Sequence, residues 1–317
     1  MTVKQRPRIR QSVAVEAFGL PLELPEGLLT CALRPATEGE LRPPTLVTVE
    51  PDPIAPWDVD RVERVREMQH QGRVIWSVDF DQELGFQMQA PGLATMVVTN
   101  DGLTVRCAPV ANTADIAWSA VIPAQALPLA ATLRYLEVLH ASAVTVDGRA
   151  LVFCAAPGVG KSSLAAQLVL RGAGLLSDDA VAIDDDLVVH PSTGAVHLRS
   201  AELERLDQPA RDRLGIGADT RFDGRAVGSV APAEPAPLHA VCLLERAPDG
   251  PAVEPVEAVD PAILLGSTFN LSVRSPERLL RHLDFCARIA TDVAVVRLRI
   301  TPGIDAVTLA GEVLRCL

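Results

Sequence analysis

The stretch that decides the fold is LVFCAAPGVGKSSLAAQLVLRG, residues 151–172. Residues 151–154 are apolar and partly β-branched or aromatic, which predicts a short buried strand. A turn follows over residues 156–160, and residues 164–170 have the pattern of a helix that stops at Gly172. A strand, a glycine-containing loop, Lys-Ser and a helix in this order are typical of a phosphate-binding loop.

Each part of this loop has a physical reason to bind phosphate. Backbone N–H groups in the turn form a nest for an anion, and the start of the helix adds unsatisfied donors and the positive end of its dipole. The Lys161 ammonium can reach the β- and γ-phosphates, and the Ser162 hydroxyl can ligate Mg²⁺. A chance Gly-Lys-Ser at a helix start is the alternative, and the flanking strand and helix argue against it. The residues expected to hold the nucleotide are Pro157, Gly158, Val159, Gly160, Lys161, Ser162 and Ser163.

One residue of the loop departs from the usual pattern. The consensus has a glycine at position 155, where this chain has Ala155. The loss is mild if the backbone there avoids a positive φ. Lysine occurs only at Lys4 and Lys161, and every other strongly basic residue is an arginine. Because arginine differs from lysine in reach and donor geometry, this choice supports a functional role for Lys161.

Composition limits the classes of function. The 317 residues are 48% hydrophobic and 3% aromatic, with a net charge of −11. This is enough core material for two domains, and the negative charge argues against a nucleic-acid or anionic-membrane partner. Six scattered cysteines without a C-x-x-C spacing indicate buried thiols in a reducing compartment. With no secretory signal and no run of 18 apolar residues, we expect a cytoplasmic protein.

The chain is predicted to hold a β-rich domain over residues 1–125 and a larger domain over residues 126–317. In the first, residues 93–99 and 103–110 flank Asn100-Asp101-Gly102 and predict a β-hairpin. Residues 59–69 suggest a short helix. A structural, dimerising or substrate-presenting role for this domain is left open, and so is homo-oligomer formation.

Polar residues flank the predicted phosphate-binding loop on both sides. Asp178-Asp179 follows a short apolar strand, 17 residues after Lys161, where carboxylates suit Mg²⁺ binding and proton transfer from an acceptor hydroxyl. Two such close charges also raise one pKa. His140 comes just before a strand expected to pair with the loop strand, which places it near the phosphates. The alternatives are a solvated turn for the aspartates and a helix cap or core residue for His140; residues 184–186 are interpreted as such a turn.

The rest of the second domain offers fewer chemical signals. Residues 211–237 suggest a long loop, in which Arg221 and Arg225 are either exposed or able to reach phosphates. Strands are expected at 238–245 and 293–300, and helices at 260–269, 275–290 and 304–317. In the helix 275–290, Leu279, Leu283 and Cys286 form the predicted core face.

The run LHASAVTVDGRALVFCAAPGVGKSSLAAQLVLRGAGLLSDDAVAID, residues 139–184, resembles the catalytic domain of HPr kinase/phosphorylase and its relatives. That family has a histidine before a strand pair, a phosphate-binding loop, and an Asp-Asp pair at this distance from the loop lysine. PLHAVCLLER (237–246) and RHLDF (281–285) also look like the HPr-kinase-related proteins often encoded with lasso-peptide and other peptide-modification genes. The resemblance is specific over residues 135–190. It implies an α/β (α+β) fold, a phosphoenolpyruvate-carboxykinase-like P-loop kinase domain after a smaller β-rich N-terminal domain.

The resemblance also implies roles for residues. Lys161 would stabilise the transferring phosphoryl group and Ser162 would contact Mg²⁺. Asp178 would be the general base and Asp179 would complete the metal site, or the two would exchange these roles. His140 would lie beside Asp178 and orient it, and Glu204 would match a family carboxylate near the metal.

The sequence departs from the bifunctional members of that family, which carry a Glu-Ile-Arg-Gly signature where residues 202–213 here are ELERLDQPARDR. The expected activity is therefore ATP- and Mg²⁺-dependent transfer of the γ-phosphoryl group to Ser or Thr of a peptide or protein, such as a natural-product precursor, or to a small hydroxyl compound. A nucleotide-binding regulator or scaffold and a generic P-loop ATPase or GTPase are the alternatives. ATP is the default nucleotide because no guanine-specific N-K-x-D is present.

Overall fold

The computed structural model describes residues 11–36, 42–217, 221–222, 225–269 and 272–316, and the chain divides into two compact units. The first comprises Met1–Glu16, Leu20–Thr30 and Pro35–Arg134, and the second comprises Ala17–Gly19, Cys31–Arg34 and Tyr135–Leu317. The main boundary thus lies at 134/135 and not at 125/126. The reason is that the helix after residue 126 packs on the first unit. Gly102 of that unit lies so close to the helix that a Cβ added to it would be 2.7 Å from the Ala130 carbonyl oxygen.

The first unit is built on one nine-stranded sheet with the order β3-β1-β2-β4-β9-β8-β7-β6-β5. Its strands are β1 (Ser12–Ala17), β2 (Leu20–Pro25), β3 (Arg34–Pro35), β4 (Thr45–Val49), β5 (Glu63–His70), β6 (Arg73–Asp81), β7 (Gly85–Ala90), β8 (Ala94–Val98) and β9 (Thr104–Pro109). The predicted hairpin is confirmed, since β8 and β9 pair antiparallel and Gly102 has a φ of +67°. The helix suggested for 59–69 is wrong, because β5 pairs along most of β6 and sheet pairing overrides local preference.

A helical segment closes the first unit. It consists of α1 (Asp115–Ser119), the π-helical turn η1 (Ile122–Ala126) and α2 (Leu127–Leu133). By length and composition, residues 115–133 could cross a membrane, yet 61% of the apolar window is buried in the structure. A core helix of this kind passes the same test, so the segment is weak evidence for a membrane span.

The second unit is mixed α/β. Its strands are β10 (Glu137–Leu139), β11 (Ala141–Val146), β12 (Arg149–Cys154), β13 (Gly174–Ser177), β14 (Val181–Ile183), β15 (Val188–His190), β16 (Ala195–Arg199), β17 (Arg221–Phe222), β18 (Arg225–Ser229), β19 (Ala236–Arg246), β20 (Val253–Pro255) and β21 (Ala294–Ile300). Its helices are α3 (Lys161–Val169), α4 (Ser200–Leu203), α5 (Gln208–Arg213), α6 (Ala262–Leu265), α7 (Pro276–Asp292) and α8 (Ala306–Cys316). The main sheet has the order β10-β14-β15-β19-β12-β11-β13, with β21 beside β19 and β20 beside β21.

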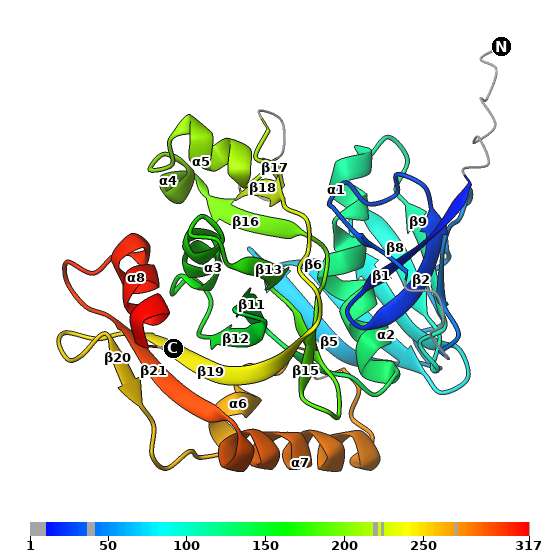
Figure 1. The fold of residues 1–317 in the computed structure, drawn as a ribbon. Coiled ribbons are helices and arrows are strands. Elements are labelled where there is room, and N and C mark those ends of the chain that lie inside the picture. The colour runs from blue at the N-terminus through cyan, green and yellow to red at the C-terminus, as the bar shows by residue number, and fades with distance from the viewer. Residues whose placement is uncertain (1–10, 37–41, 218–220, 223–224, 270–271, 317) are drawn as a thin grey trace. The chain divides into compact units, whose positions relative to one another are not determined.

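Helices cover both faces of this sheet (Figure 1). Side chains alternate along β12, as they do in any strand. Val152 and Cys154 join the core cluster that includes Phe285 and Ile289 of α7. Leu151 and Phe153 point the other way, into the cluster formed with α3 and α8. The central strand is therefore apolar on both faces, as its continuous hydrophobic sequence predicts.

Strand directions bring three loops to one edge of the sheet. β11 lies between β12 and β13 and runs antiparallel to both. In this register Ala141 pairs with Cys154, and Ala143 pairs with Ser177. The residue before β11 and the residues after β12 and β13 consequently meet at the same edge.

Two predicted features of the second unit are wrong. Residues 211–237 are not one long loop, because they contain the end of α5 and the strands β17 and β18, which form a small sheet with β16. The helix expected at 260–269 is only the single turn α6. In the first segment long-range pairing with β16 decides the structure, and in the second the helix stops before Gly266 and residue 268 forms a bridge with Leu139.

The core face of α7 also differs from the prediction. Cys286 is buried as expected, but Leu279 and Leu283 are 45% and 51% exposed. The buried face instead carries Arg278 and His282. The reason is a buried carboxylate on β10, described below, which draws these two polar side chains inward.

Candidate active site

The predicted phosphate-binding loop joins β12 to α3 and has the backbone of an anion site. Gly158 and Gly160 have φ values of +83° and +130°, which residues with a Cβ rarely adopt. Gly160 is the N-cap of α3, and no side chain caps this helix. The first N–H groups of α3 are therefore left for a ligand or water.

Ala155 fits its position without strain, since it is not among the residues with positive φ. Its side chain packs against the core cluster beneath α3. Its carbonyl oxygen accepts a hydrogen bond from Lys161 Nζ at 3.0 Å. The structure thus explains how the loop tolerates alanine where the consensus has glycine.

Lys161 is a nearly buried cation, only 7% exposed. Burial lowers the pKa of its ammonium, and the negative charges of Asp179 and Asp178 act in the opposite direction. The other loop residues surround it at the start of α3. Pro157 and Gly158 are exposed, Ser162 and Ser163 are half-buried, and Val159 packs against the core.

Asp178 is a fully buried carboxylate, with no exposed side-chain area. Its Oδ1 accepts from Ser142 Oγ at 2.6 Å, and its Oδ2 accepts from the backbone N–H of His197 at 2.9 Å. Burial by itself raises the pKa of Asp178, but the His197 imidazole and these hydrogen bonds outweigh burial and hold that pKa below its usual value. The expectation that crowding raises a carboxyl pKa here is therefore wrong for Asp178, which is held ionised.

His197 is the residue that sequence reasoning missed. It lies on β16, with Nδ1 3.4 Å from Asp178 Oδ2. Burial lowers the pKa of the His197 imidazole, but Asp178 and Asp179 outweigh burial and raise it above its usual value. The sequence did contain a signal for His197. Polar and apolar residues alternate along β16, so His197 and Arg199 occupy one face of this strand and Val196 and Leu198 the other.

Asp179 differs from its neighbour in almost every respect. Its side chain is 39% exposed and its Oδ1 lies 3.5 Å from His140 Nδ1. Its φ is +81°, a conformation that costs an L-residue about 1–2 kcal/mol and that aspartate adopts more readily than most residues. Burial is the main cause that lowers the pKa of His140, so this imidazole is held neutral beside the carboxylate. The structure thus places His140 beside Asp179 and not beside Asp178.

The backbone of His140 is fixed from the other side. Its N–H donates to the Ser267 carbonyl at 2.5 Å, and Leu139 forms a bridge with Thr268. The N–H of Phe269 donates to the Val138 carbonyl at 3.0 Å. The segment after α6 therefore holds β10 as a short added strand and sets the position of His140.

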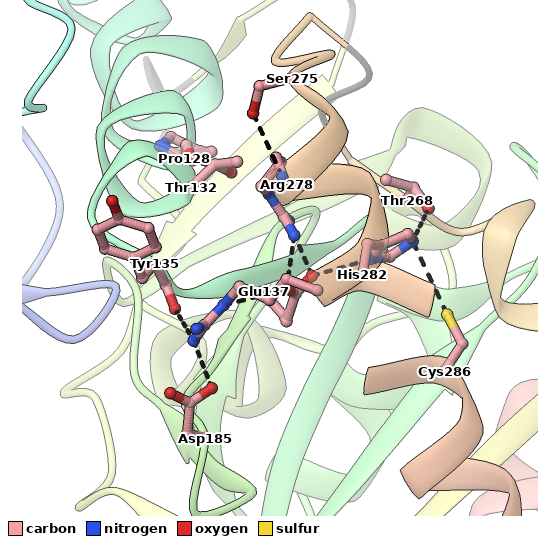
Figure 2. A network of polar contacts seen from close by, with 11 residues as sticks. Pro128, Thr132, Tyr135, Glu137, Asp185, Thr268, Ser275, Arg278, His282 and Cys286 are labelled. Atoms are coloured by element: carbon pink, nitrogen blue, oxygen red, sulfur yellow. Dashed lines mark hydrogen bonds and ion pairs between the residues drawn. The ribbon is translucent and has the colours of Figure 1, made fainter. Parts of the chain in front are cut away.

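A buried ionic network lies beneath β10 (Figure 2). Glu137 Oε1 and Oε2 accept from the two terminal nitrogens of Arg278 at 2.5 and 2.7 Å. His282 Nδ1 lies 2.8 Å from Glu137 Oε2, and His282 Nε2 lies 2.7 Å from Thr268 Oγ1. The network joins α7 to β10 and to the segment that holds His140.

Glu202, and not Glu204, is the acidic residue of α4 that reaches the loop. Glu202 accepts hydrogen bonds from Ser163 Oγ and from the backbone N–H of Arg199, the latter at 2.8 Å. Glu204 is exposed. The match of Glu204 to a family carboxylate near the metal stays a prediction, and the contact with Ser163 makes Glu202 the acidic residue that the structure places at the loop.

The acidic side chains near the loop could bind a metal ion only together with ligands from outside the protein. In the part of the chain that the structure describes, no group of three or more His, Cys, Asp and Glu side chains could hold a metal by itself. Mg²⁺ in phosphoryl-transfer enzymes usually takes one or two carboxylates, with phosphate oxygens and water as its other ligands. The half-exposed Asp179 carboxylate, with the Ser162 hydroxyl at the start of α3, is a donor set of that kind.

Comparisons with known proteins add little to this geometry. No protein-family model matches the chain, and no curated protein matches it. Among solved structures, the HPr(Ser) kinase/phosphatase of Coxiella burnetii is similar, with 15% sequence identity and a TM-score of 0.30 over 56% of this chain and 88% of that chain. This similarity is too low to transfer a fold, an activity or a site from one protein to the other.

Proposed function

We propose that the second unit binds a nucleoside triphosphate, ATP by default, together with Mg²⁺, and transfers the γ-phosphoryl group to a hydroxyl group. One observation carries the proposal. A half-exposed carboxylate, Asp179, lies beside the neutral imidazole of His140, at the sheet edge where the phosphate-binding loop begins. A loop alone would serve a binding protein equally well, whereas a reachable carboxylate beside the loop suits an acceptor hydroxyl.

The reaction would use these groups in defined roles. Lys161 and the N-terminus of α3 would neutralise the phosphates, and Asp179 and Ser162 would hold Mg²⁺ against them. The acceptor oxygen attacks the γ-phosphorus, the bond to the β,γ-bridging oxygen breaks, and the nucleoside diphosphate leaves. The hydroxyl proton passes to a carboxylate. Asp179 suits this proton transfer because it is exposed, and Asp178 would orient the site from its buried position. Asp179 would thus add the base role, which the family resemblance gives to Asp178, to its place at the metal.

The finer assignments are part of the same proposal. The acceptor would be Ser or Thr of a peptide or protein, such as a natural-product precursor peptide, or a small hydroxyl compound. The fold would be of the phosphoenolpyruvate carboxykinase type, and the protein would act in the cytoplasm without a nucleic-acid or membrane partner. The mixed sheet around β12 supports the proposed fold, and the negative net charge supports the proposal that no nucleic acid or anionic membrane is a partner.

Transfer from γ-labelled ATP with Mg²⁺ to a panel of peptides and small hydroxyl compounds tests the proposal. Asp179→Asn should lower the rate by about 10²–10⁴-fold, as loss of a general base does. Asp178→Asn should also slow transfer, whereas Asp186→Asn, on an exposed turn of the same unit, is the matched control and should not.

The alternatives predict different results. ATP binding without transfer to any acceptor would favour a regulator or scaffold. Acceptor-independent hydrolysis that survives Asp179→Asn would favour a generic NTPase.

A further inference from the structure

Two arginines face each other next to the phosphate-binding loop. Arg199 of β16 and Arg225 of β18 are directly paired in the antiparallel register of the small sheet. Like charges at such positions repel and destabilise a sheet. Within the described residues, the structure shows no ion pair for either side chain. The arrangement therefore has a cost in the free protein that an anion would remove.

The pair lies at the mouth of the proposed nucleotide site. A Cβ placed on Gly158 would lie 3.0 Å from Arg199 Nη2, so this guanidinium rests against the tip of the loop. Arg225 is the register partner of Arg199, so the pairing of β16 with β18 brings it to the same end of the small sheet. Both arginines are thus close to the groups expected to meet phosphate.

Several less exposed arginines of the second unit are paired with carboxylates. Arg278 is paired with Glu137, and Arg299 with Glu245 and Glu254. Glu202 is close to Arg199, but its oxygens accept from Ser163 Oγ and from the Arg199 backbone N–H. In a chain with a net charge of −11, two adjacent guanidinium groups without such partners indicate a place for an external anion.

We propose that Arg199 and Arg225 form a second anion subsite beside the phosphate-binding loop and that this subsite binds a phosphate group. The planar guanidinium matches phosphate oxygens in a bidentate way, and two of them can hold one dianion. The phosphate has two sources: the terminal phosphate of the bound nucleotide, or a phosphate that the acceptor already carries. The choice between these sources rests on the proposed function, whereas phosphate binding itself does not.

Calorimetric titration with inorganic phosphate and with a non-hydrolysable ATP analogue tests the subsite. Arg199→Gln and Arg225→Gln should each weaken binding of at least one of these ligands by about tenfold or more, the loss expected for a charge-assisted contact. Arg213→Gln, an exposed arginine of α5, is the matched control and should bind both like wild type. Without ligand, Arg225→Gln should have an unfolding midpoint no lower than that of wild type, because the repulsion is gone.

The two sources of phosphate give different patterns. If the terminal phosphate of the nucleotide occupies the subsite, Arg225→Gln weakens the ATP analogue and leaves ADP unchanged. If the phosphate comes from the acceptor, the variant binds ATP analogue and ADP like wild type. Inorganic phosphate then binds to the wild-type complex with the ATP analogue, and Arg225→Gln abolishes that binding.

Failure of this inference can be told from failure of the proposed function. If both arginine variants bind inorganic phosphate and the ATP analogue as the Arg213→Gln control does, the subsite is overturned, whatever the transfer assay shows. If the variants lose phosphate but no acceptor is phosphorylated by wild type, the subsite stands and the kinase proposal fails.

Discussion

Two buried carboxylates of the second unit, Glu137 and Asp178, differ in the groups that surround and neutralise them. Glu137 meets the fixed positive charge of Arg278 through two hydrogen bonds, with His282 against the same carboxylate. Asp178 meets a hydroxyl, a backbone N–H and a titratable imidazole, and Asp179 follows it immediately. In both carboxyls burial alone would raise the pKa, and in both the surrounding hydrogen bonds lower it.

The difference separates a structural site from one that is built for a ligand. The negative charge of Glu137 is always neutralised by Arg278 inside the protein, so this site does not need a ligand. Around Asp178 the negative charge exceeds what the neighbouring histidine supplies, because Asp179 adds a second carboxylate that faces solvent. A cation or a protonated group from outside completes the second site, and this agrees with its position at the phosphate-binding loop.

The largest expected change in stability comes from Glu137→Ala, which leaves the buried Arg278 side chain without its carboxylate partner. Breaking one partner of a buried ion pair costs about 3–5 kcal/mol. Urea unfolding should show this loss in the free energy of unfolding. Glu254→Ala is the control, because that carboxylate is paired with arginines yet 39% exposed, and such pairs contribute about 0–1 kcal/mol. Equal losses in the two variants would remove the distinction between Glu137 and a surface carboxylate.

Removing the hydroxyl that supports Asp178 should have a smaller effect. Ser142→Ala deletes a hydrogen bond to a buried carboxylate, which is worth about 1.5–3 kcal/mol. The folded pKa of Asp178 should also rise. Stability from a depressed carboxyl pKa is present above the unfolded value of 3.8 and is lost as pH falls through the folded pKa. Acid unfolding of Ser142→Ala should therefore begin at a higher pH than that of wild type, and an unchanged acid midpoint would contradict the assigned hydrogen bond.

The two histidines near the aspartates should give opposite and smaller pH effects. The folded pKa of His197 is raised, so its contribution to stability is complete below the unfolded value of 6.5 and is lost as pH rises through the folded pKa. The folded pKa of His140 is lowered, so the protein loses stability as pH falls below 6.5. His197→Gln and His140→Gln should change the slope of stability against pH with opposite signs. Slopes that change in the same direction would refute this assignment.

The comparison also shows what the sequence can predict. The strand, loop and helix of residues 149–169 follow from local rules of turn chemistry and periodicity. The antiparallel pairing of β11 with β12 follows from the short turn at residues 147–148 that joins them. The Asp178-Asp179 pair was recognised because both residues are adjacent in the chain. These features need no knowledge of distant contacts.

The missed residues depend on pairing between distant segments. His197 reaches Asp178 only because of where β16 lies in the fold. The strand β18 could not be predicted because its sequence has the composition of a loop. Glu137 and Arg278 are 141 residues apart, and their attraction turned α7 so that Arg278 and His282 face the core while Leu279 faces solvent. Hydrophobic periodicity cannot anticipate a helix whose buried face is selected by a buried charge.

The smallest expected effect is that of Thr268→Val, at the outer edge of the Glu137 network. It removes the hydrogen bond between Thr268 Oγ1 and His282 Nε2 and should cost about 0.5–1.5 kcal/mol in the free energy of unfolding. The backbone bridge from residue 268 to Leu139 and the hydrogen bond from His140 to Ser267 do not use that side chain. Phosphoryl transfer per folded molecule should therefore equal that of wild type. A fall in transfer without a matching loss of stability would mean that the ionic network under β10 acts directly on His140, and the separation of the two carboxylate sites would no longer hold.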